Sequence, residues 1–458
     1  MRFLEQAAEF LATADADEGA IGAAREALTD YVGVAIAGAR EPVTRNVLAW
    51  ATERGSGGSS SVIGHAARLD PEHAALCNGV AGHALDFDDT SWTTIAHPTT
   101  VVAPAAFAIG ESAGASGREV VLAYLAGVEV AHRLADLSMP AVSRNGWHTT
   151  AVFYTLGAAA AACRLLDLER SVTINALALS LSRAGGIRAN FGTQTKPYHA
   201  GMAARNGLEA VSLARAGLTA SGEAVEGADG FIRCFTGSPA GEQVLPGPVR
   251  FGRPYDLVAR GLAYKRYPCC SGSHPACDLL LDLVARHGFG PAQVAEIHVG
   301  TSLLAERELV CHDPRTPAQA RFSMEFVLAA ALVHGEVTLD SFTEARLADP
   351  LTRQVMGRVR MALSPDLARL GFIGTAPVEM TIVLHDGRRI GGHRDLAVGN
   401  PERPMSEADR ERKFVSCAGR RLSATAARAL YGRLQRIDAV PDFGFFMPTL
   451  AGASLDAR

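Results

Sequence analysis

The spacing of apolar residues predicts that the first 265 residues form one helix after another. Residues 19–38 carry apolar side chains at the interval of one helix face, namely Ile21, Ala24, Leu28, Val32 and Ile36. Comparable spacing continues in residues 71–85, 98–113, 118–135, 149–166, 171–183 and 197–216. Several of these segments begin with Pro, Ser or Thr and end near Gly, as helices do. Their Ala- and Gly-rich faces predict close packing of helix against helix.

The pattern changes after a turn-rich segment at residues 237–252. Polar and apolar residues then alternate as in strands, in residues 294–301, 359–363 and 378–384. His385-Asp386-Gly387 predicts a hairpin turn into a returning strand at 389–394. We expect two helices among these strands, at 275–287 and 317–334, and two final helices at 406–417 and 423–435.

These elements predict a mainly α protein built from two domains. A chain of 458 residues is too long for one ordinary core. We expect a large all-α helical domain formed by residues 1–265 with 396–458, and a smaller α+β lid domain at 266–395. Strand and helix do not alternate, and no GxGxxG follows a strand, so a Rossmann nucleotide site is not expected.

Composition narrows the possible partners. With 48% hydrophobic and 20% charged residues, the chain is globular rather than disordered. A net charge of −4 provides no basic field for nucleic acid or anionic lipid. The start of the chain does not resemble a signal peptide, and the longest apolar run, 149–163, is shorter than a membrane span of ~20 residues. We therefore expect no nucleic-acid partner and no membrane contact.

Two residue types add to this picture. The eight cysteines include no CxxC pair, which predicts free, reduced thiols and a cytoplasmic location. Lys and Arg total 44, yet the sequence contains only Lys196, Lys265 and Lys413 as lysines. Because Arg serves almost everywhere else, the remaining lysines are candidates for roles that need a compact ammonium group.

Two polar clusters precede expected helices in the first half of the chain. The first contains Asp86, Asp88, Asp89 and Thr90 and is followed by His97-Pro98. Its carboxylates are equally compatible with helix capping and with catalysis, and their spacing is not that of an EF-hand. In the second cluster, His148 opens a helix of small residues. A lone histidine at such a place is more often structural, but two of them suggest one site.

Two further clusters carry positive charge. Glycines surround Arg188, Lys196 and His199, and Pro197 is expected at the first position of a helix, whose free N–H groups favour an anion. The fourth cluster, at the expected hinge, contains Lys265, Cys269, Cys270 and His274. It is equally compatible with a plain linker. It is too small and badly spaced for zinc, and its thiols have no clear partner base.

With these clusters in view, the sequence resembles the MmgE/PrpD family, whose members include 2-methylcitrate dehydratase, cis-aconitate decarboxylase and iminodisuccinate epimerase. The matching motifs span nearly the whole chain in order: GHALDFDDT (82–90) with His97-Pro98, GWHTTAVFYTLGAAAAACRLLDL (146–168), GTQTKPYHAGMAARNGLEA (192–210), VEGADGF (225–231), YKRYPCCSGSHPA (264–276), DPRTPAQARFSMEFVLAAALVHGEV (313–337) and NPERPMS (400–406). The resemblance implies a helical domain with an α+β lid, a homodimer, a pocket between the domains, and neither metal nor organic cofactor.

The resemblance also implies a set of site residues. The family's active-site positions fall on Asp86, Thr90, His97, His148, Lys196 and Lys265. Two positions depart from the decarboxylase, because Cys270 replaces a histidine and Phe326 replaces a tyrosine of the lid helix. One residue is also inserted between Thr90 and His97. The two replacements favour a reaction other than decarboxylation.

The reactions of this family share the loss of a proton or of carbon dioxide next to a carboxylate. We expect Lys196 and Lys265 to hold substrate carboxylates and His97 and His148 to transfer protons, with Asp86 orienting one imidazole. The substrate-binding set is completed by Thr90, Arg188, His199, Cys270 and His274.

The sequence thus predicts cofactor-independent proton abstraction on a small di- or tricarboxylic acid. The sequence favours three activities, in decreasing order of preference: a 2-methylcitrate dehydratase-like hydro-lyase, an epimerase of an iminodicarboxylate, and a cis-aconitate decarboxylase-like enzyme. A non-catalytic scaffold is disfavoured because the polar clusters are complete and Lys196 and Lys265 lie in motif segments, whereas Lys413 does not.

Overall fold

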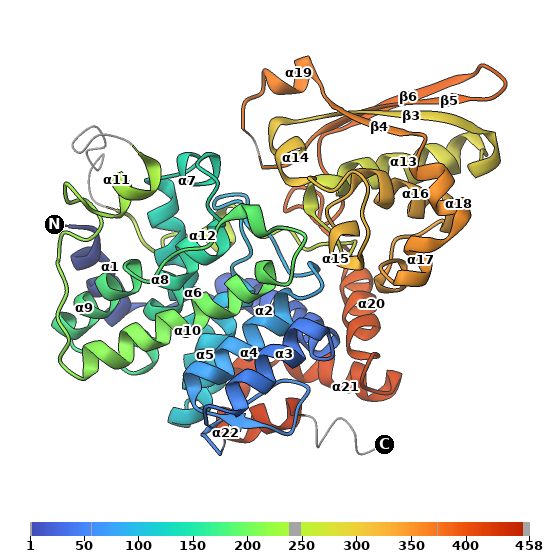
Figure 1. The fold of residues 1–458 in the computed structure, drawn as a ribbon. Coiled ribbons are helices and arrows are strands. Elements are labelled where there is room, and N and C mark those ends of the chain that lie inside the picture. The colour runs from blue at the N-terminus through green and yellow to red at the C-terminus, as the bar shows by residue number, and fades with distance from the viewer. Residues whose placement is uncertain (1, 56, 238–248, 373, 452–458) are drawn as a thin grey trace.

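Helices from both ends of the chain share one hydrophobic core (Figure 1). The computed structural model describes residues 2–55, 57–237, 249–372 and 374–451. The core combines side chains between Phe3 and Leu262 with others between Phe414 and Leu450. Its helices are α1 (Phe3–Thr13), α2 (Glu18–Gly38), α3 (Pro42–Thr52), α4 (Pro71–His83), α5 (Thr99–Ala113), α6 (Gly117–Asp136), α7 (Ala141–Arg144), α8 (Thr149–Leu165), α9 (Arg170–Leu181), α10 (Thr195–Arg215), α11 (Phe231–Thr236), α12 (Asp256–Ala259), α20 (Glu407–Ala418), α21 (Ala424–Leu434) and α22 (Phe443–Phe446). A two-stranded ribbon, β1 (Ser60–Ser61) with β2 (Arg68–Leu69), lies beside them.

A second core lies between Tyr267 and Ile390 and belongs to a four-stranded sheet with its helices. The strands run in the order β4 (Val359–Leu363), β3 (Val294–Thr301), β5 (Val378–Leu384) and β6 (Arg389–Arg394), with only β3 and β4 parallel. The helices of this part are α13 (His274–His287), α14 (Leu303–Glu308), α15 (Pro317–Ala320), α16 (Met324–His334), α17 (Glu344–Ala348), α18 (Pro350–Met356) and α19 (Pro365–Ala368). Figure 1 shows α13 and α16 against one face of the sheet. Strand β5 alternates buried and half-buried residues, as expected for a sheet covered on one side.

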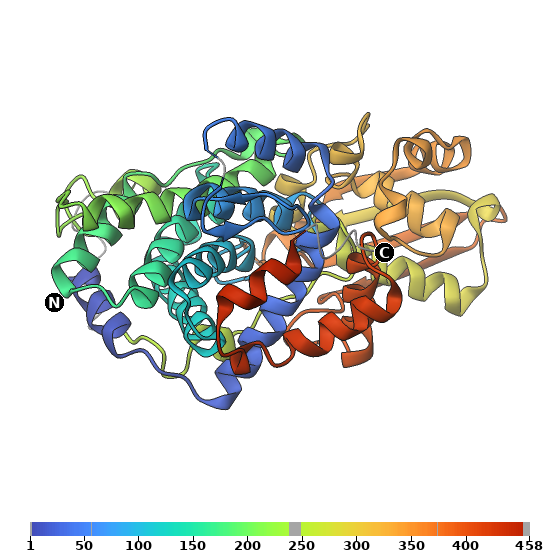
Figure 2. The same cartoon turned by 90° about the horizontal axis from the view of Figure 1, so that it is seen from below.

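The mainly α fold with a smaller α+β part is as predicted, and all four strands have the predicted bounds. Gly387 turns the β5–β6 hairpin with a positive φ of 87°. The predicted turn-rich segment lies partly outside the described residues. The division into residues 1–265 with 396–458 and residues 266–395 stays our proposal for the domain boundaries. Figure 2 shows α20 and α21 packed on the helical part, although they follow the sheet in sequence.

Two predicted helices differ from the structure. The apolar pattern over 317–334 suggested one helix, but the chain breaks into α15 and α16 because the Ser323 hydroxyl caps α16 and accepts from the Phe326 N–H. Helix α10 begins at Thr195, so Pro197 is its third residue rather than its first. Proline is tolerated there because N–H groups of the first helical turn have no partner within the helix.

Helices α4 and α10 approach each other closely, and this contact positions the site. A Cβ atom on Gly201 of α10 would lie 2.2 Å from the Leu76 carbonyl oxygen of α4. Helix α4 ends at His83, just before the Asp86 cluster, and α10 begins beside Lys196. Gly201 therefore sets the distance between these two polar segments.

None of the helices in the described ranges is long and apolar enough to cross a membrane. All eight cysteines are free thiols, as predicted.

We predict that Gly201→Ala lowers the free energy of unfolding by about 1–3 kcal/mol, because the added methyl group forces α4 and α10 apart. Gly22→Ala is the matched control, since a Cβ at this helical glycine of α2 meets nothing within 4 Å. That control should be neutral or stabilising by up to about 1 kcal/mol. Denaturant unfolding of both variants checks this. Equal effects would show that the α4–α10 contact is not tight.

Candidate active site

The carboxylate of Asp86 is shared by two buried lysines. Asp86 follows α4 in a left-handed conformation with φ 51°, and only 4% of its surface is exposed. The Lys196 ammonium, from the first turn of α10, donates to Oδ1. The Lys265 ammonium donates to Oδ2 and to the Asp86 carbonyl oxygen, both at 2.9 Å. Burial alone would raise the pKa of Asp86, but the two ammonium groups outweigh it and hold that pKa well below the usual value.

The third lysine holds the same stretch of chain from another side. Lys413 of α20 donates to the Phe87 carbonyl oxygen at 2.8 Å and pairs with Asp30 at 2.7 Å. Its ammonium also lies 4.3 Å from the centroid of the Phe87 ring. All three lysines of the chain therefore contact residues 86–87, a role that the sequence did not indicate for Lys413.

The three carboxylates of the first cluster serve different partners. Asp86 binds the ammonium groups, whereas Asp88 accepts from His83 Nδ1 at 2.8 Å. Asp89 accepts from the hydroxyl of Thr99 and, at 3.4 Å, from its N–H, at the first residue of α5. Burial raises the pKa of Asp89 to about 8. The helix-capping interpretation thus fits Asp89, whereas Asp86 and Asp88 bind side chains of other site residues.

The two predicted catalytic histidines have different hydrogen-bond partners. His97 Nδ1 lies 2.6 Å from the Asp89 carbonyl oxygen, which can only accept, so Nδ1 carries the proton and Nε2 is left as an acceptor. His148 Nδ1 lies 3.1 Å from Nδ1 of His199. Among the described residues, the buried Nε2 of His148 has no hydrogen-bond partner.

Both imidazoles are neutral at pH 7. Burial lowers the pKa of His97 well below 6.5, and the nearby Asp88 only partly opposes this. Burial also lowers the pKa of His148 well below 6.5, and the Lys196 ammonium lowers it further. Burial also lowers the pKa of His199, to about 4. Near neutral pH these rings are therefore in the neutral form, which can accept a proton at one ring nitrogen and donate from the other.

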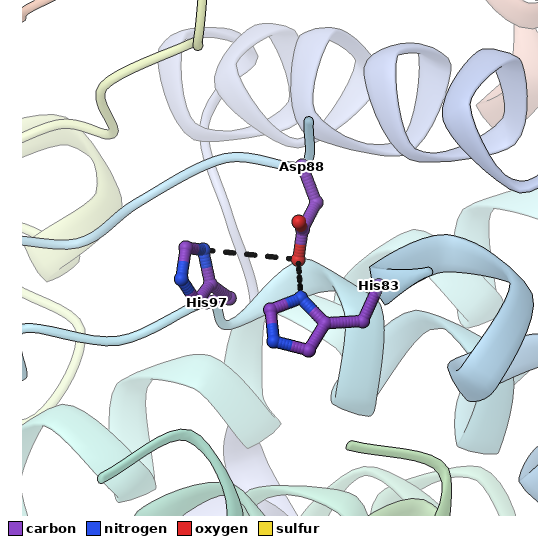
Figure 3. A group of neighbouring side chains, drawn as sticks. All are labelled: His83, Asp88 and His97. Atoms are coloured by element: carbon purple, nitrogen blue, oxygen red, sulfur yellow. Dashed lines mark hydrogen bonds and ion pairs between the residues drawn. The ribbon is translucent and has the colours of Figure 1, made fainter. Parts of the chain in front are cut away.

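Asp88 lies between the imidazoles of His83 and His97 (Figure 3), with its Oδ2 3.7 Å from Nδ1 of His97. One ligand atom from each of the three residues lies within 4.8 Å of the others, a spacing that could hold a metal ion. However, the Nδ1 protons of both histidines already bind oxygen atoms. Burial lowers the pKa of His83, and the Lys196 ammonium lowers it further. The positive charge of Lys196 therefore already acts on these three side chains. The arrangement fits a hydrogen-bonded triad better than a site for a divalent cation.

Eight of the ten predicted site residues line one cavity: Asp86, Thr90, His97, His148, Arg188, Lys196, Lys265 and Cys270. The helical part supplies the first six, the hinge supplies Lys265 and Cys270, and Glu308 of α14 with Phe322 completes the lining from the α+β part. The free volume is about 30 Å³, enough for about one water molecule. A small acid therefore enters only when the lining side chains or the α+β part move.

The other two predicted residues do not line this cavity. His199 reaches it only through its contact with His148. His274 was predicted to bind substrate, but its Nε2 lies 3.2 Å from the Cys269 carbonyl oxygen and its ring packs against Tyr267. That position does not support a direct contact with substrate. Phe326 also lies elsewhere, buried in the second core against Phe342.

Sequence reasoning missed the aromatic neighbours of Lys196. The rings of Phe191 and Phe322 lie with their centroids 5.2 and 5.0 Å from its ammonium, close enough for cation–π contacts. Phe191 lies inside the glycine-rich segment that predicted anion binding, and this was the only indication in the sequence that it belongs to the site. Phe322 and Glu308 come from distant parts of the chain, and nothing in the sequence indicated that they line the site.

Comparison with known proteins agrees with the motifs. The model of the MmgE/PrpD N-terminal domain matches residues 5–243, and that of the MmgE/PrpD C-terminal domain matches residues 267–434. The chain is 31% identical to cis-aconitate decarboxylase of Homo sapiens over 84% of its length and 81% of the relative. It is 30% identical to the mouse (Mus musculus) enzyme of the same name over 96% and 90%. It is 27% identical to that of Aspergillus terreus over 73% and 72%.

We predict that Asp86→Asn lowers the free energy of unfolding at pH 7 by about 3–5 kcal/mol, because two buried ammonium groups lose their counter-charge. The difference from the wild type should shrink in acid. A depressed Asp pKa stabilises the fold above the unfolded-state value of about 3.9, and this contribution is lost as the pH falls through the folded-state pKa.

Denaturant unfolding at pH 7 and at a series of pH values below about 3.9 measures both effects. Asp366→Asn is the matched control, because it removes a carboxylate from an exposed pair with Arg369 and should change little. A loss for Asp86→Asn no larger than that of this control would show that the shared carboxylate does not stabilise the fold.

Proposed function

Because the chain belongs to the MmgE/PrpD family, we propose that it is a lyase that acts beside a carboxylate of a small di- or tricarboxylic acid. One observation carries this proposal: two ammonium groups and two neutral imidazoles line the same cavity. Negative charge that develops next to a carboxylate needs fixed cations around it and a base directed at carbon. The cavity provides both kinds of group.

The cations would hold the substrate. Lys196 and Lys265 already meet at one carboxylate, that of Asp86, and Arg188 lines the same space. A substrate carboxylate beside these groups would bind in a region that contains little water, where charge–charge attraction is stronger than in bulk solvent. The Thr90 hydroxyl, 3.1 Å from that of Ser271, adds a donor on the hinge side.

His97 would be the base. Its Nδ1 proton is bound to the Asp89 carbonyl oxygen, which leaves the lone pair of Nε2 for a proton from carbon. His148 would be the donor if its Nδ1 accepts from His199, because the proton of the neutral ring then lies on Nε2. Loss of water would use both groups. Loss of carbon dioxide would need only the cations and one proton donor for the carbon left behind.

Two observations bear on the choice of reaction. The human and mouse relatives named cis-aconitate decarboxylase support a cis-aconitate-like acid and the loss of carbon dioxide. Phe326, one of the two departures from the decarboxylase, does not line the cavity, so its missing hydroxyl does not affect the chemistry there. We therefore place decarboxylation first, which reverses the order expected from the sequence.

Loss of water from a 2-methylcitrate-like acid is the second candidate, and Cys270 favours it. Burial raises the pKa of this thiol well above its usual value, so it is a poor proton donor where the decarboxylase has a histidine.

A screen of small di- and tricarboxylic acids in deuterated water tests the proposal. We expect release of carbon dioxide from cis-aconitate, with deuterium on the carbon atom that loses the carbon dioxide. Water loss from 2-methylcitrate without carbon dioxide would identify the hydro-lyase instead. Deuterium at the α-carbon with no change of heavy atoms would identify an epimerase. No exchange and no product with any acid would contradict a lyase.

For loss of water, His97→Gln should lower kcat/KM by about 10²–10⁴-fold with the fold intact, because the base that faces the substrate is removed. His298→Gln is the matched control, since this histidine lies half exposed on β3 and pairs with Glu296. Steady-state kinetics with circular dichroism check both variants. Full activity of His97→Gln would exclude His97 as the base.

The pH profile of the wild type gives a separate test. A neutral base loses activity when it is protonated, so kcat/KM for loss of water should fall toward acid. Because burial depresses the pKa of His97, we expect the midpoint of this acidic limb well below pH 6.5. A midpoint above pH 6.5 would contradict the neutral imidazole in the free enzyme.

A further inference from the structure

A second cavity lies next to the first and is much larger. It is bounded by residues 41–43, 83–86, 192–197, 316–322 and Glu344, and we call it the interdomain cavity. Its free volume is about 440 Å³, against about 30 Å³ for the catalytic cavity. Asp86, Lys196 and Phe322 line both cavities, so the Asp86–Lys196 pair lies on their common wall.

The guanidinium of Arg321 lines this cavity without a direct ion pair, and the negative charges of Glu41 and Asp86 act on it from farther away. Arg321 is only 6% exposed, and the structure shows no side-chain hydrogen bond or ion pair for it among the described residues. Its guanidinium lies 5.3 Å from the centroid of the Phe342 ring, a contact that brings no negative charge. Glu41 and Glu344 line the same cavity, but neither lies within ion-pair distance of Arg321.

A buried cation without a partner is costly by several kcal/mol, so its retention needs a reason. The backbone around Arg321 is fixed, since its carbonyl oxygen accepts from the Cys270 N–H at 2.9 Å. This bond ties the backbone of Arg321 to the segment that carries Cys270 and Lys265. A bound anion would supply the direct ion pair that Arg321 lacks.

Further features of the wall favour an anion. Helix α10, of 21 residues, begins at the cavity, and its N-cap residue Gln194 makes no side-chain cap. Its first N–H groups thus add partial positive charge to that of Lys196 and Arg321. Carbon-rich side chains, Val43, Pro197, Pro317 and Phe322, form much of the remaining wall. A small organic anion matches this combination of cationic and apolar surface.

We infer that the interdomain cavity binds a small polycarboxylate, with Arg321 as its counter-charge. The choice of a carboxylate among anions rests on the proposed function, since substrates or products of that reaction would be the anions at hand. The binding itself does not require turnover. Because Lys196 and Asp86 lie on the common wall, an anion in this cavity would also act on the pair that holds the substrate.

Calorimetric titration of the full chain with tricarballylate, which has neither a hydroxyl group nor a double bond, tests the inference. We expect two sites per chain in the wild type. Arg321→Gln should weaken one of them by at least about 30-fold and leave the other unchanged. Arg315→Gln, at an exposed arginine of the segment just before α15, is the matched control and should keep both sites. Inorganic phosphate should not replace tricarballylate at the Arg321 site.

Arg321→Lys is a second variant for the case in which Arg321→Gln misfolds. It keeps the positive charge and should keep the second site with reduced affinity. One site in the wild type, or two unchanged sites in Arg321→Gln, would overturn the inference. Equal binding of phosphate at the second site would overturn the assignment to carboxylates. Failure of the lyase assays with two intact sites would instead contradict only the proposed reaction.

Discussion

The site depends on one buried carboxylate. Asp86 receives Lys196 from α10 and Lys265 from the hinge, and neither ammonium could stay buried at low cost without it. Its left-handed backbone aims the carboxylate at both lysines, and Lys413 holds the next peptide group in place. The close contact of α4 with α10 at Gly201 brings Asp86 and Lys196 within reach of each other. A single ion network thus joins three distant parts of the chain.

The same cations shape the chemistry of the histidines. The Lys196 ammonium adds to burial in lowering the pKa of His148, and both lysines lower that of His97. The groups proposed to hold a substrate carboxylate therefore also keep the imidazoles neutral. Asp88 opposes this effect on His97, and its bond to His83 fixes its own position. Base strength and anion affinity in this cavity are linked, so a change in one alters the other.

Local pattern in the sequence was enough to predict most of the fold. The strands appeared with their observed bounds, in β5 because one covered face imposes strict alternation and in β6 because a hairpin turn precedes the strand. The break between α15 and α16 was missed because apolar spacing continues through Ser323, whose capping hydrogen bond is seen only in the three-dimensional structure.

The sequence also predicted much of the candidate site, since eight of the residues selected from it line one cavity. His274 is close to these residues in sequence, but its ring contacts the backbone of Cys269 and does not line the cavity. Lys413 and Arg321 went unrecognised, since only tertiary structure shows what surrounds them.

We infer that the lysines bound to Asp86 receive a substrate carboxylate in front of His97. A crystal structure with a bound, non-reacting tricarboxylate tests it most directly. We expect a carboxylate oxygen within hydrogen-bond distance of Nζ of Lys196 or Lys265, with His97 Nε2 facing the neighbouring carbon. An occupied complex in which no carboxylate approaches either lysine, and in which His97 faces only protein, would contradict it.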